Sequence, residues 1–185
     1  MLGRSHQICS IAIVQLCVTL TQPITLHNVI PDIILLVSTG VGALIPDIDQ
    51  KKSTASKKSP VKLSPFLSHR GITHTLLGWL IFTGVLYFLM QLLYPFDYRI
   101  PQYHTWWLAV WLGLIIGYLL HLVEDSFSHQ GVQWLAPFIK KRHRKKFFSY
   151  KVGGPFEKWL VTIASLSISV MSLLWIWQIM GSQFL

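Results

Sequence analysis

The residues of this sequence best suited to chemistry are histidines and carboxylates at the ends of apolar segments. One group is His121-Leu-Val-Glu-Asp125-Ser-Phe-Ser-His129. Residues four apart share one face of a helix, so His121, Asp125 and His129 are expected to lie together. Imidazole nitrogen and carboxylate oxygen are ligands for zinc, manganese or iron. Glu124 points about 100° away from Asp125 on such a helix, so we expect it to act as a base or to support a ligand.

A second group is Pro46-Asp47-Ile48-Asp49. Proline disfavours helix at the preceding residue, so the apolar segment before it is expected to end here. If the chain is extended at this point, Asp47 and Asp49 face the same way. Two carboxylates in that arrangement can share one or two metal ions.

A third group is the motif His69-Arg-Gly-Ile-Thr-His74, and the isolated His6 opens the first apolar segment. The glycine permits a bend between the two histidines of the motif. Thr73 is expected to cap the following helix, which would place His74 in its first turn. Arg70 can hold a phosphate or a carboxylate through two hydrogen bonds.

The elements that must position these groups are apolar helices. The chain of 185 residues is 52% hydrophobic and only 12% charged, whereas soluble domains carry about 25% charged residues. We therefore predict an all-α integral membrane protein that forms one membrane domain over residues 1–185, with four to five transmembrane helices. The first segment is short for a span, and the last three are long enough to cross a bilayer. The segments are Ile8–Leu20, Val29–Ile45, Thr75–Leu93, Thr105–Val123 and Trp159–Met180.

The positive charges predict which side of the membrane these groups occupy. The net charge is +9, and fifteen of the sixteen basic residues precede the first segment or lie in the connections at 46–74 and 124–158. Lys and Arg accumulate in cytoplasmic loops. The N-terminus and the motif loops are therefore expected to be cytoplasmic, with the basic segment at 135–158 on the same side and a final transmembrane helix at 159–180.

The basic run Lys140–Lys146 lies between aromatic and aliphatic residues. This pattern favours contact with anionic lipid headgroups, and a solvated basic loop is the alternative. No nucleic-acid-binding motif is present, so we expect no nucleic-acid partner.

The charge pattern places three motifs that are distant in the chain, together with His6, on one membrane face. We therefore predict a shared site for a divalent metal, with zinc favoured over manganese or iron. The alternative is that each group has a separate structural role. More ligands are available than one tetrahedral ion needs, so one or two ions are expected. The candidate ligands are His6, Asp47, Asp49, His74, His121 and Asp125.

At these residues the sequence resembles the YdjM-like group of bacterial inner-membrane proteins, which are described as membrane-bound metal-dependent hydrolases. The resemblance rests on His6, on Ile-Pro-Asp-Ile-Asp (45–49), on His-Arg-Gly-Ile-Thr-His (69–74) and on Gly-Tyr-Leu-Leu-His-Leu-Val-Glu-Asp (117–125). It covers roughly residues 1–134 and implies a multi-pass protein of the bacterial inner membrane. Ser128 stands where that group has a threonine, and His129 is additional. The helix bearing His121 and Asp125 is also similar to one in zinc-dependent phospholipase C enzymes.

These observations favour a membrane-bound hydrolase that cleaves a phosphoester or a lipid-linked substrate. A metal ion would lower the pKa of a bound water toward about 7 and polarise a phosphoryl oxygen. Asp49 or Glu124 is expected to accept the proton of the water. Arg70 and His69 are expected to bind the phosphate or to support a ligand.

Two other classes of protein use similar residues. A non-enzymatic scaffold or lipid-binding protein would need the basic run but not the histidines and aspartates. A divalent-metal transporter would carry ionisable residues toward the middle of the bilayer. The ranges 81–88 and 163–174 contain none, which disfavours transport.

Overall fold

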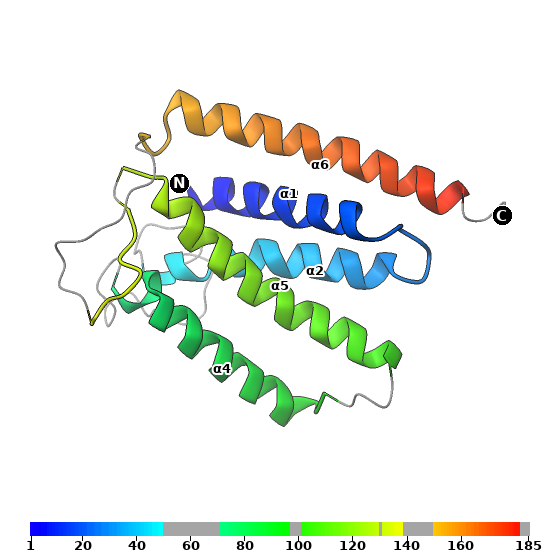
Figure 1. The fold of residues 1–185 in the computed structure, drawn as a ribbon, viewed down its shortest axis with the longest axis horizontal. Helices are drawn as coiled ribbons and strands as arrows, with labels where there is room; N and C mark the ends of the chain where they lie inside the picture. The colour runs from blue at the N-terminus through cyan, green and yellow to red at the C-terminus, as the bar shows by residue number, and fades with distance from the viewer. Residues whose placement is uncertain (50–70, 97–100, 130, 139–149, 182–185) are drawn as a thin grey trace.

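Helices form most of the chain (Figure 1). The computed structural model describes residues 1–49, 71–96, 101–129, 131–138 and 150–181, with the backbone alone described at Asp49 and at 101–105. The interpretations of His69, of Arg70 and of the run Lys140–Lys146 therefore lie outside the described residues. The same holds for the side chain of Asp49.

The prediction of an all-α membrane protein is confirmed. Within the described ranges no β-strand forms, and β-structure is limited to isolated bridges such as that between Ser128 and Tyr150. Four segments are long and apolar enough to cross a membrane, at 29–48, 76–93, 106–126 and 155–181. The long helices are α1 (Gly3–Thr21), α2 (Val29–Gly42), α4 (Leu76–Leu93), α5 (Pro101–Ser126) and α6 (Pro155–Gly181), and two short 3₁₀ helices are η1 (Pro46–Asp49) and η2 (Ile72–His74).

Helix α1 begins five residues before the apolar run from which it was predicted. It starts at Gly3 instead of Ile8, so His6 lies inside the helix. It contacts both α2 and α6, and it buries the polar residues Ser10 and Gln15. Because its partners cover these groups, α1 needs less apolar character than the four candidate spans. The C-terminal half of α1 contributes Val14 and Val18 to a hydrophobic core that also contains Ile24 and Trp175.

Helices α2 and α5 approach until their backbones touch. A Cβ atom added at Gly117 would lie 2.1 Å from the Thr39 carbonyl oxygen, and one at Gly42 would lie 2.3 Å from the Leu114 carbonyl oxygen. Small residues four apart allow such close packing between membrane helices, and α5 carries Gly113 and Gly117 at that spacing. The contact fixes the rotation of α5, and His121 lies one helical turn beyond Gly117.

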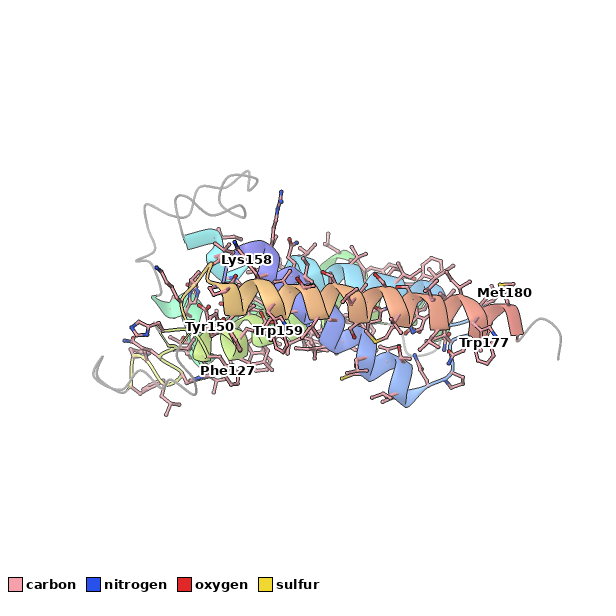
Figure 2. All side chains as sticks on the ribbon, turned by 90° about the horizontal axis from the view of Figure 1, so that it is seen from above. Phe127, Tyr150, Lys158, Trp159, Trp177 and Met180 are labelled. Carbon is pink, nitrogen blue, oxygen red and sulfur yellow. The ribbon has the colours of Figure 1, made fainter. Side chains whose placement is uncertain are left out.

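Exposed aromatic residues indicate where the membrane surfaces lie. Trp159 and Trp177 are 61% and 73% exposed toward the two ends of α6 (Figure 2). They are 18 residues apart, which is about 27 Å along a helix, close to the hydrocarbon thickness of about 30 Å. Tryptophan favours the headgroup level. Figure 1 shows the N-terminus, η1, η2 and the end of α5 gathered at the same end of the molecule as the start of α6, so this end lies near one membrane surface.

Candidate metal centre

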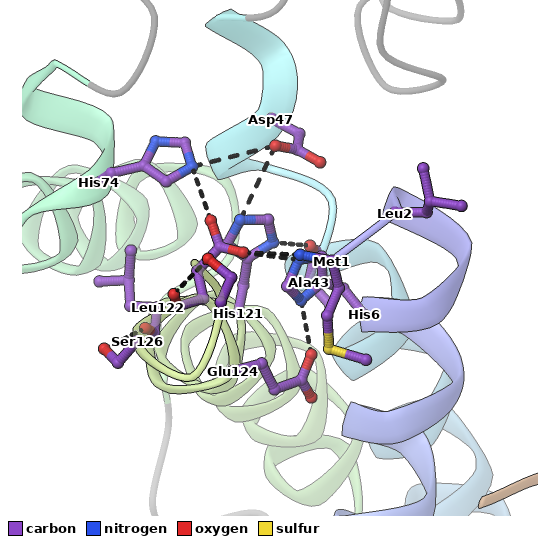
Figure 3. Close-up of polar contacts among 12 residues, drawn as sticks. Met1, Leu2, His6, Ala43, Asp47, His74, His121, Leu122, Glu124 and Ser126 are labelled. Atoms are coloured by element: carbon purple, nitrogen blue, oxygen red, sulfur yellow. Dashed lines mark hydrogen bonds and ion pairs between the residues drawn. The ribbon is translucent and has the colours of Figure 1, made fainter. Parts of the chain in front are cut away.

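Five side chains from four elements meet at this end of the helices (Figure 3). They form two groups of three residues. Within each group, the possible ligand atoms all lie within 4.8 Å of one another. One group is His6, His121 and Asp125, and the other is Asp47, His74 and His121. We call these five residues the His/Asp cluster. All five are buried, and His121 belongs to both groups.

Helix α5 positions His121 and Asp125 four residues apart, as the sequence predicted. The Nδ1 atom of His121 lies 2.7 Å from the Ala43 carbonyl oxygen at the end of α2. A carbonyl accepts a hydrogen bond, so Nδ1 carries the proton and Nε2 keeps its lone pair. Nε2 lies 3.8 Å from Asp47 Oδ1. The imidazole is therefore fixed in the tautomer and orientation that a metal ligand requires.

Helix α1 brings His6 against the same imidazole. The two rings stack with their centroids 3.8 Å apart. His6 Nδ1 lies 2.6 Å from Glu124 Oε2, and His6 Nε2 lies 3.3 Å from Asp125 Oδ1. The second oxygen of Glu124 accepts a hydrogen bond of 3.0 Å from Ser10. Glu124 therefore holds the His6 ring from the side opposite the cluster, which is the supporting role considered for it from the sequence.

Asp47 enters the cluster from η1. Its Oδ1 atom lies 3.8 Å from His121 Nε2 and 3.9 Å from His74 Nε2. The expectation of an extended chain at Asp47 and Asp49 was wrong, because Pro46–Asp49 forms a 3₁₀ helix. A 3₁₀ helix turns about 120° per residue, which removes the reason for the two carboxylates to face the same way.

His74 comes from η2 and lies 3.9 Å from Asp125 Oδ2 through its Nε2 atom. Tyr118 of α5 holds this segment by donating a 2.6 Å hydrogen bond to the Thr73 carbonyl oxygen. The expectation that Thr73 caps the next helix was wrong. The cap is Thr75, whose hydroxyl accepts a 3.0 Å hydrogen bond from the backbone N–H of Gly78. His74 therefore precedes α4 instead of lying in its first turn.

The expectation that His129 shares the face of His121 and Asp125 was also wrong. Helix α5 ends at Ser126, three residues before His129. The His129 side chain is exposed, and its backbone N–H donates to the Tyr150 carbonyl oxygen at 3.1 Å. A helix end therefore removes the last member of an i, i+4, i+8 series.

The donor atoms of the cluster have the spacing and the chemistry of a metal site. The Nε2 atom of His121 is buried and makes no hydrogen bond within the described ranges, although burying such a group without a partner is costly. Ligands bonded at about 2.0–2.2 Å to a tetrahedral ion lie about 3.4 Å from one another. The measured separations between nitrogen and carboxylate oxygen run from 3.3 to 3.9 Å. These residues fit a divalent metal ion.

A positive group already lies against one carboxylate of the cluster. The Met1 ammonium donates a 2.8 Å hydrogen bond to Asp125 Oδ1. Three buried carboxylates (Asp47, Glu124 and Asp125) need such compensation, because a buried negative charge is stable only when it is paired or bound to a metal. The site thus has the electrostatics of a cation-binding centre.

Two residues near the cluster were not predicted from the sequence. Glu157 at the start of α6 is 1% exposed and accepts 2.8 Å hydrogen bonds from the backbone N–H groups of Leu2 and Gly153. It ties the start of α1 to the start of α6. Tyr150 is 5% exposed and packs against Phe156. The only sequence signal for Glu157 was that an acidic residue opens an apolar run.

Replacing Glu124 by glutamine is expected to weaken metal binding by about 10–100-fold, because a neutral amide makes His6 a poorer ligand. Ser10→Ala is the matched control, since it removes the other hydrogen bond of Glu124 and leaves the carboxylate beside His6. Titration of the purified protein against a zinc-chelating dye measures the change. Equal affinities for Glu124→Gln and the parent would contradict this role.

Apolar helices that enclose a buried cluster of histidines and carboxylates define a helical membrane protein with a candidate metal centre. The sequence matches the model of the family "YdjM inner membrane protein" over residues 1–184. The chain belongs to this family. The match extends beyond the residues 1–134 that carry the motifs and includes α6.

The relatives found by sequence comparison come from several bacteria. The chain is 32% identical over 142 residues to YvsG of Bacillus subtilis. This match covers 75% of this chain and 77% of YvsG. It is 28% identical over 122 residues to the inner membrane protein YdjM of Escherichia coli, covering 63% of this chain and 56% of that protein. It is 26% identical over 107 residues to YfhP of Bacillus subtilis, and this match covers 58% of this chain and 29% of YfhP. No solved structure matches the chain.

Proposed function

We propose that this protein is a membrane-bound, metal-dependent hydrolase that cleaves a phosphoester of a lipid or lipid-linked substrate at the cytoplasmic membrane face. One observation carries the proposal. The buried Nε2 atoms of His6 and His121 face carboxylates from distant parts of the chain, at separations suited to a shared divalent ion. The positive-inside distribution of Lys and Arg supports the cytoplasmic orientation.

In this reaction a water oxygen forms a bond to phosphorus, the bond from phosphorus to the ester oxygen breaks, and a proton reaches the leaving oxygen. A zinc ion at the His/Asp cluster, or manganese or iron in its place, would supply a Lewis acid for a phosphoryl oxygen and lower the pKa of a nearby water. We assign the role of base to Asp49, because both oxygens of Glu124 are hydrogen-bonded to His6 and Ser10. His69 and Arg70 are proposed to bind the phosphate, since a guanidinium matches its geometry.

A phosphoester substrate is consistent with the charges at this end of the molecule. Lys151 and Lys158 are exposed beside the start of α6, near the level of Trp159. Cations at this level attract anionic headgroups. In the described spans the ionisable groups of the cluster lie at one end, whereas the middles of α4 and α6 have none. This distribution favours chemistry at the membrane surface over transport through it.

The proposed activity is tested with purified protein in lipid nanodiscs that contain phosphatidic acid, a lysophospholipid or a bilayer phosphodiester. Release of phosphate or headgroup is followed with zinc, manganese or iron present. We expect at least one of these lipids to be hydrolysed by the parent and by His129→Ala, and the activity to be lost in His121→Ala. Hydrolysis that is equal in the parent and in His121→Ala would overturn the proposal. So would the absence of hydrolysis in a parent that folds and binds metal, which would favour a scaffold.

A further inference from the structure

An apolar groove runs along the outside of the molecule between α1, α5 and α6. It encloses about 720 Å³, a volume within the usual range of about 300–1,000 Å³ for small-molecule sites. Its long walls are apolar apart from the Cys9 thiol and the hydroxyl of Ser167 at the far end. Cys9, Ala12 and Leu16 line the α1 side, and Leu160, Ile163 and Ala164 line the α6 side.

The groove has the depth of one membrane leaflet. Its lining on α6 extends from Phe156 to Ser167, eleven residue steps or about 16 Å of helix. This is about half of the hydrocarbon thickness of about 30 Å. Ile13, Leu16 and Ile163 are each more than 40% exposed. The groove therefore opens sideways, toward the region that lipid chains occupy around a membrane helix.

One end of the groove meets the candidate metal centre. Glu124 lines the groove and also holds His6 through the 2.6 Å contact described above. Met1 lines the groove as well, and its ammonium contacts Asp125. A molecule that fills the groove therefore has its end beside Met1 and Glu124, each of which contacts a residue of the His/Asp cluster. The groove has the polarity of an amphiphile, with a long apolar part and a polar end.

Tyr150 adds a polar group that points to a ligand at this junction. Its side chain is 5% exposed and lines the groove, and its hydroxyl makes no hydrogen bond within the described ranges. Burial raises the pKa of this hydroxyl above its usual range, so it remains a neutral donor. Figure 2 shows Tyr150 and Phe127 beside the start of α6, at the end of the groove. A buried donor without a partner is costly unless a ligand satisfies it.

We propose that this groove binds one hydrocarbon chain of a phospholipid, with the phosphate of that lipid at the His/Asp cluster and the Tyr150 hydroxyl donating to an oxygen between chain and phosphate. The inference rests on the proposed function and assigns its substrate class. The occupant is a lipid of the surrounding leaflet, since the groove has the depth of that leaflet and opens toward it. The groove aligns the scissile ester with the cluster by holding the chain beside it.

The test measures binding of lysophosphatidic acid with one palmitoyl chain to the full-length protein by native mass spectrometry from detergent. We expect Ala164→Phe, which fills the groove, to weaken binding by at least about tenfold. Ala12→Phe fills it from the opposite wall and is expected to act in the same way. Leu166→Phe is the matched control, because Leu166 is 61% exposed on α6 and does not line the groove. Tyr150→Phe is expected to weaken binding by about fivefold, the loss of one hydrogen bond.

Two further probes separate the parts of the lipid. Monopalmitoylglycerol lacks the phosphate, and glycerol 3-phosphate lacks the chain, and both are expected to bind more weakly than lysophosphatidic acid. The groove assignment is overturned if the folded Ala164→Phe and Ala12→Phe variants bind the lipid as tightly as the parent, or if glycerol 3-phosphate binds equally well. The same spectra resolve bound metal. Lipid binding by a parent without metal would overturn the proposed hydrolase while supporting the groove.

Discussion

Replacing His121 by alanine is expected to remove nearly all divalent metal from the purified protein. His121 belongs to both groups of possible ligands, so its loss leaves neither group complete. The expected fall in affinity exceeds about 100-fold, because losing a group that merely supports a ligand already costs about 10–100-fold. Elemental analysis by inductively coupled plasma mass spectrometry on the monodisperse protein measures the result.

Two other variants sharpen this measurement. Asp47→Ala removes a member of one group and leaves His6, His121 and Asp125, so an intermediate loss of metal is expected. His129→Ala is the matched control, since His129 is an exposed histidine beyond the end of α5. If the parent contains no metal, or if His121→Ala retains as much as the parent, the cluster is not a metal site.

Replacing Gly117 by alanine is expected to destabilise the protein by about 3 kcal/mol, the upper end of the usual cost of overpacking. The added Cβ would lie 2.1 Å from the Thr39 carbonyl oxygen and 2.8 Å from the Ala43 backbone nitrogen. Both neighbours are backbone atoms, so a side-chain rotation cannot relieve the contact. Helix α5 must move away from α2, and His121 moves with it, so metal binding is expected to weaken as well.

Gly84→Ala is the control for this change. Gly84 lies in the middle of α4, and a Cβ added there meets nothing within 4 Å. Alanine in a helix interior is usually better than glycine by about 0.5–1 kcal/mol, so Gly84→Ala is expected to be neutral or slightly stabilising. Thermal unfolding in detergent compares the two variants. Equal midpoints would show that the α2–α5 contact relaxes without cost.

The sequence was sufficient for the helices, because each depends on a local property. The apolar runs that predicted α2, α4, α5 and α6 differ from the observed helices by at most four residues at an end. The start of α1 was predicted less well. Gly3 to Gln7 contains polar residues, and tertiary partners such as Glu124 and Glu157 determine that this segment is helical.

The charge pattern also brought the right residues together. His6, Asp47, His74, His121 and Asp125 were all expected in one site, and the structure places them within a few ångströms of one another. That these residues bind a metal remains a prediction.

The local geometry around these residues was harder to predict. Whether Pro46–Asp49 is extended or 3₁₀, and whether Thr73 or Thr75 caps α4, depends on where neighbouring backbone groups find hydrogen bonds. Two contributors came from outside the motifs. Tyr150 and Glu157 follow the basic run Lys140–Lys146 and reach the site only because α6 packs against α1. The spacing of Gly113 and Gly117 was a readable signal for close helix packing that sequence reasoning did not use.

The hydrogen bond between His121 Nδ1 and the Ala43 carbonyl oxygen limits the stoichiometry of the site. A neutral imidazole that donates through one nitrogen has a single lone pair left, on Nε2. The two groups of ligands both depend on this lone pair, so they cannot each hold an ion through His121 at the same time. The two groups are therefore alternative binding sites for one ion, and both use His121. If a metal ion binds here, the carbonyl group at the end of α2 therefore leaves His121 able to coordinate one ion per chain.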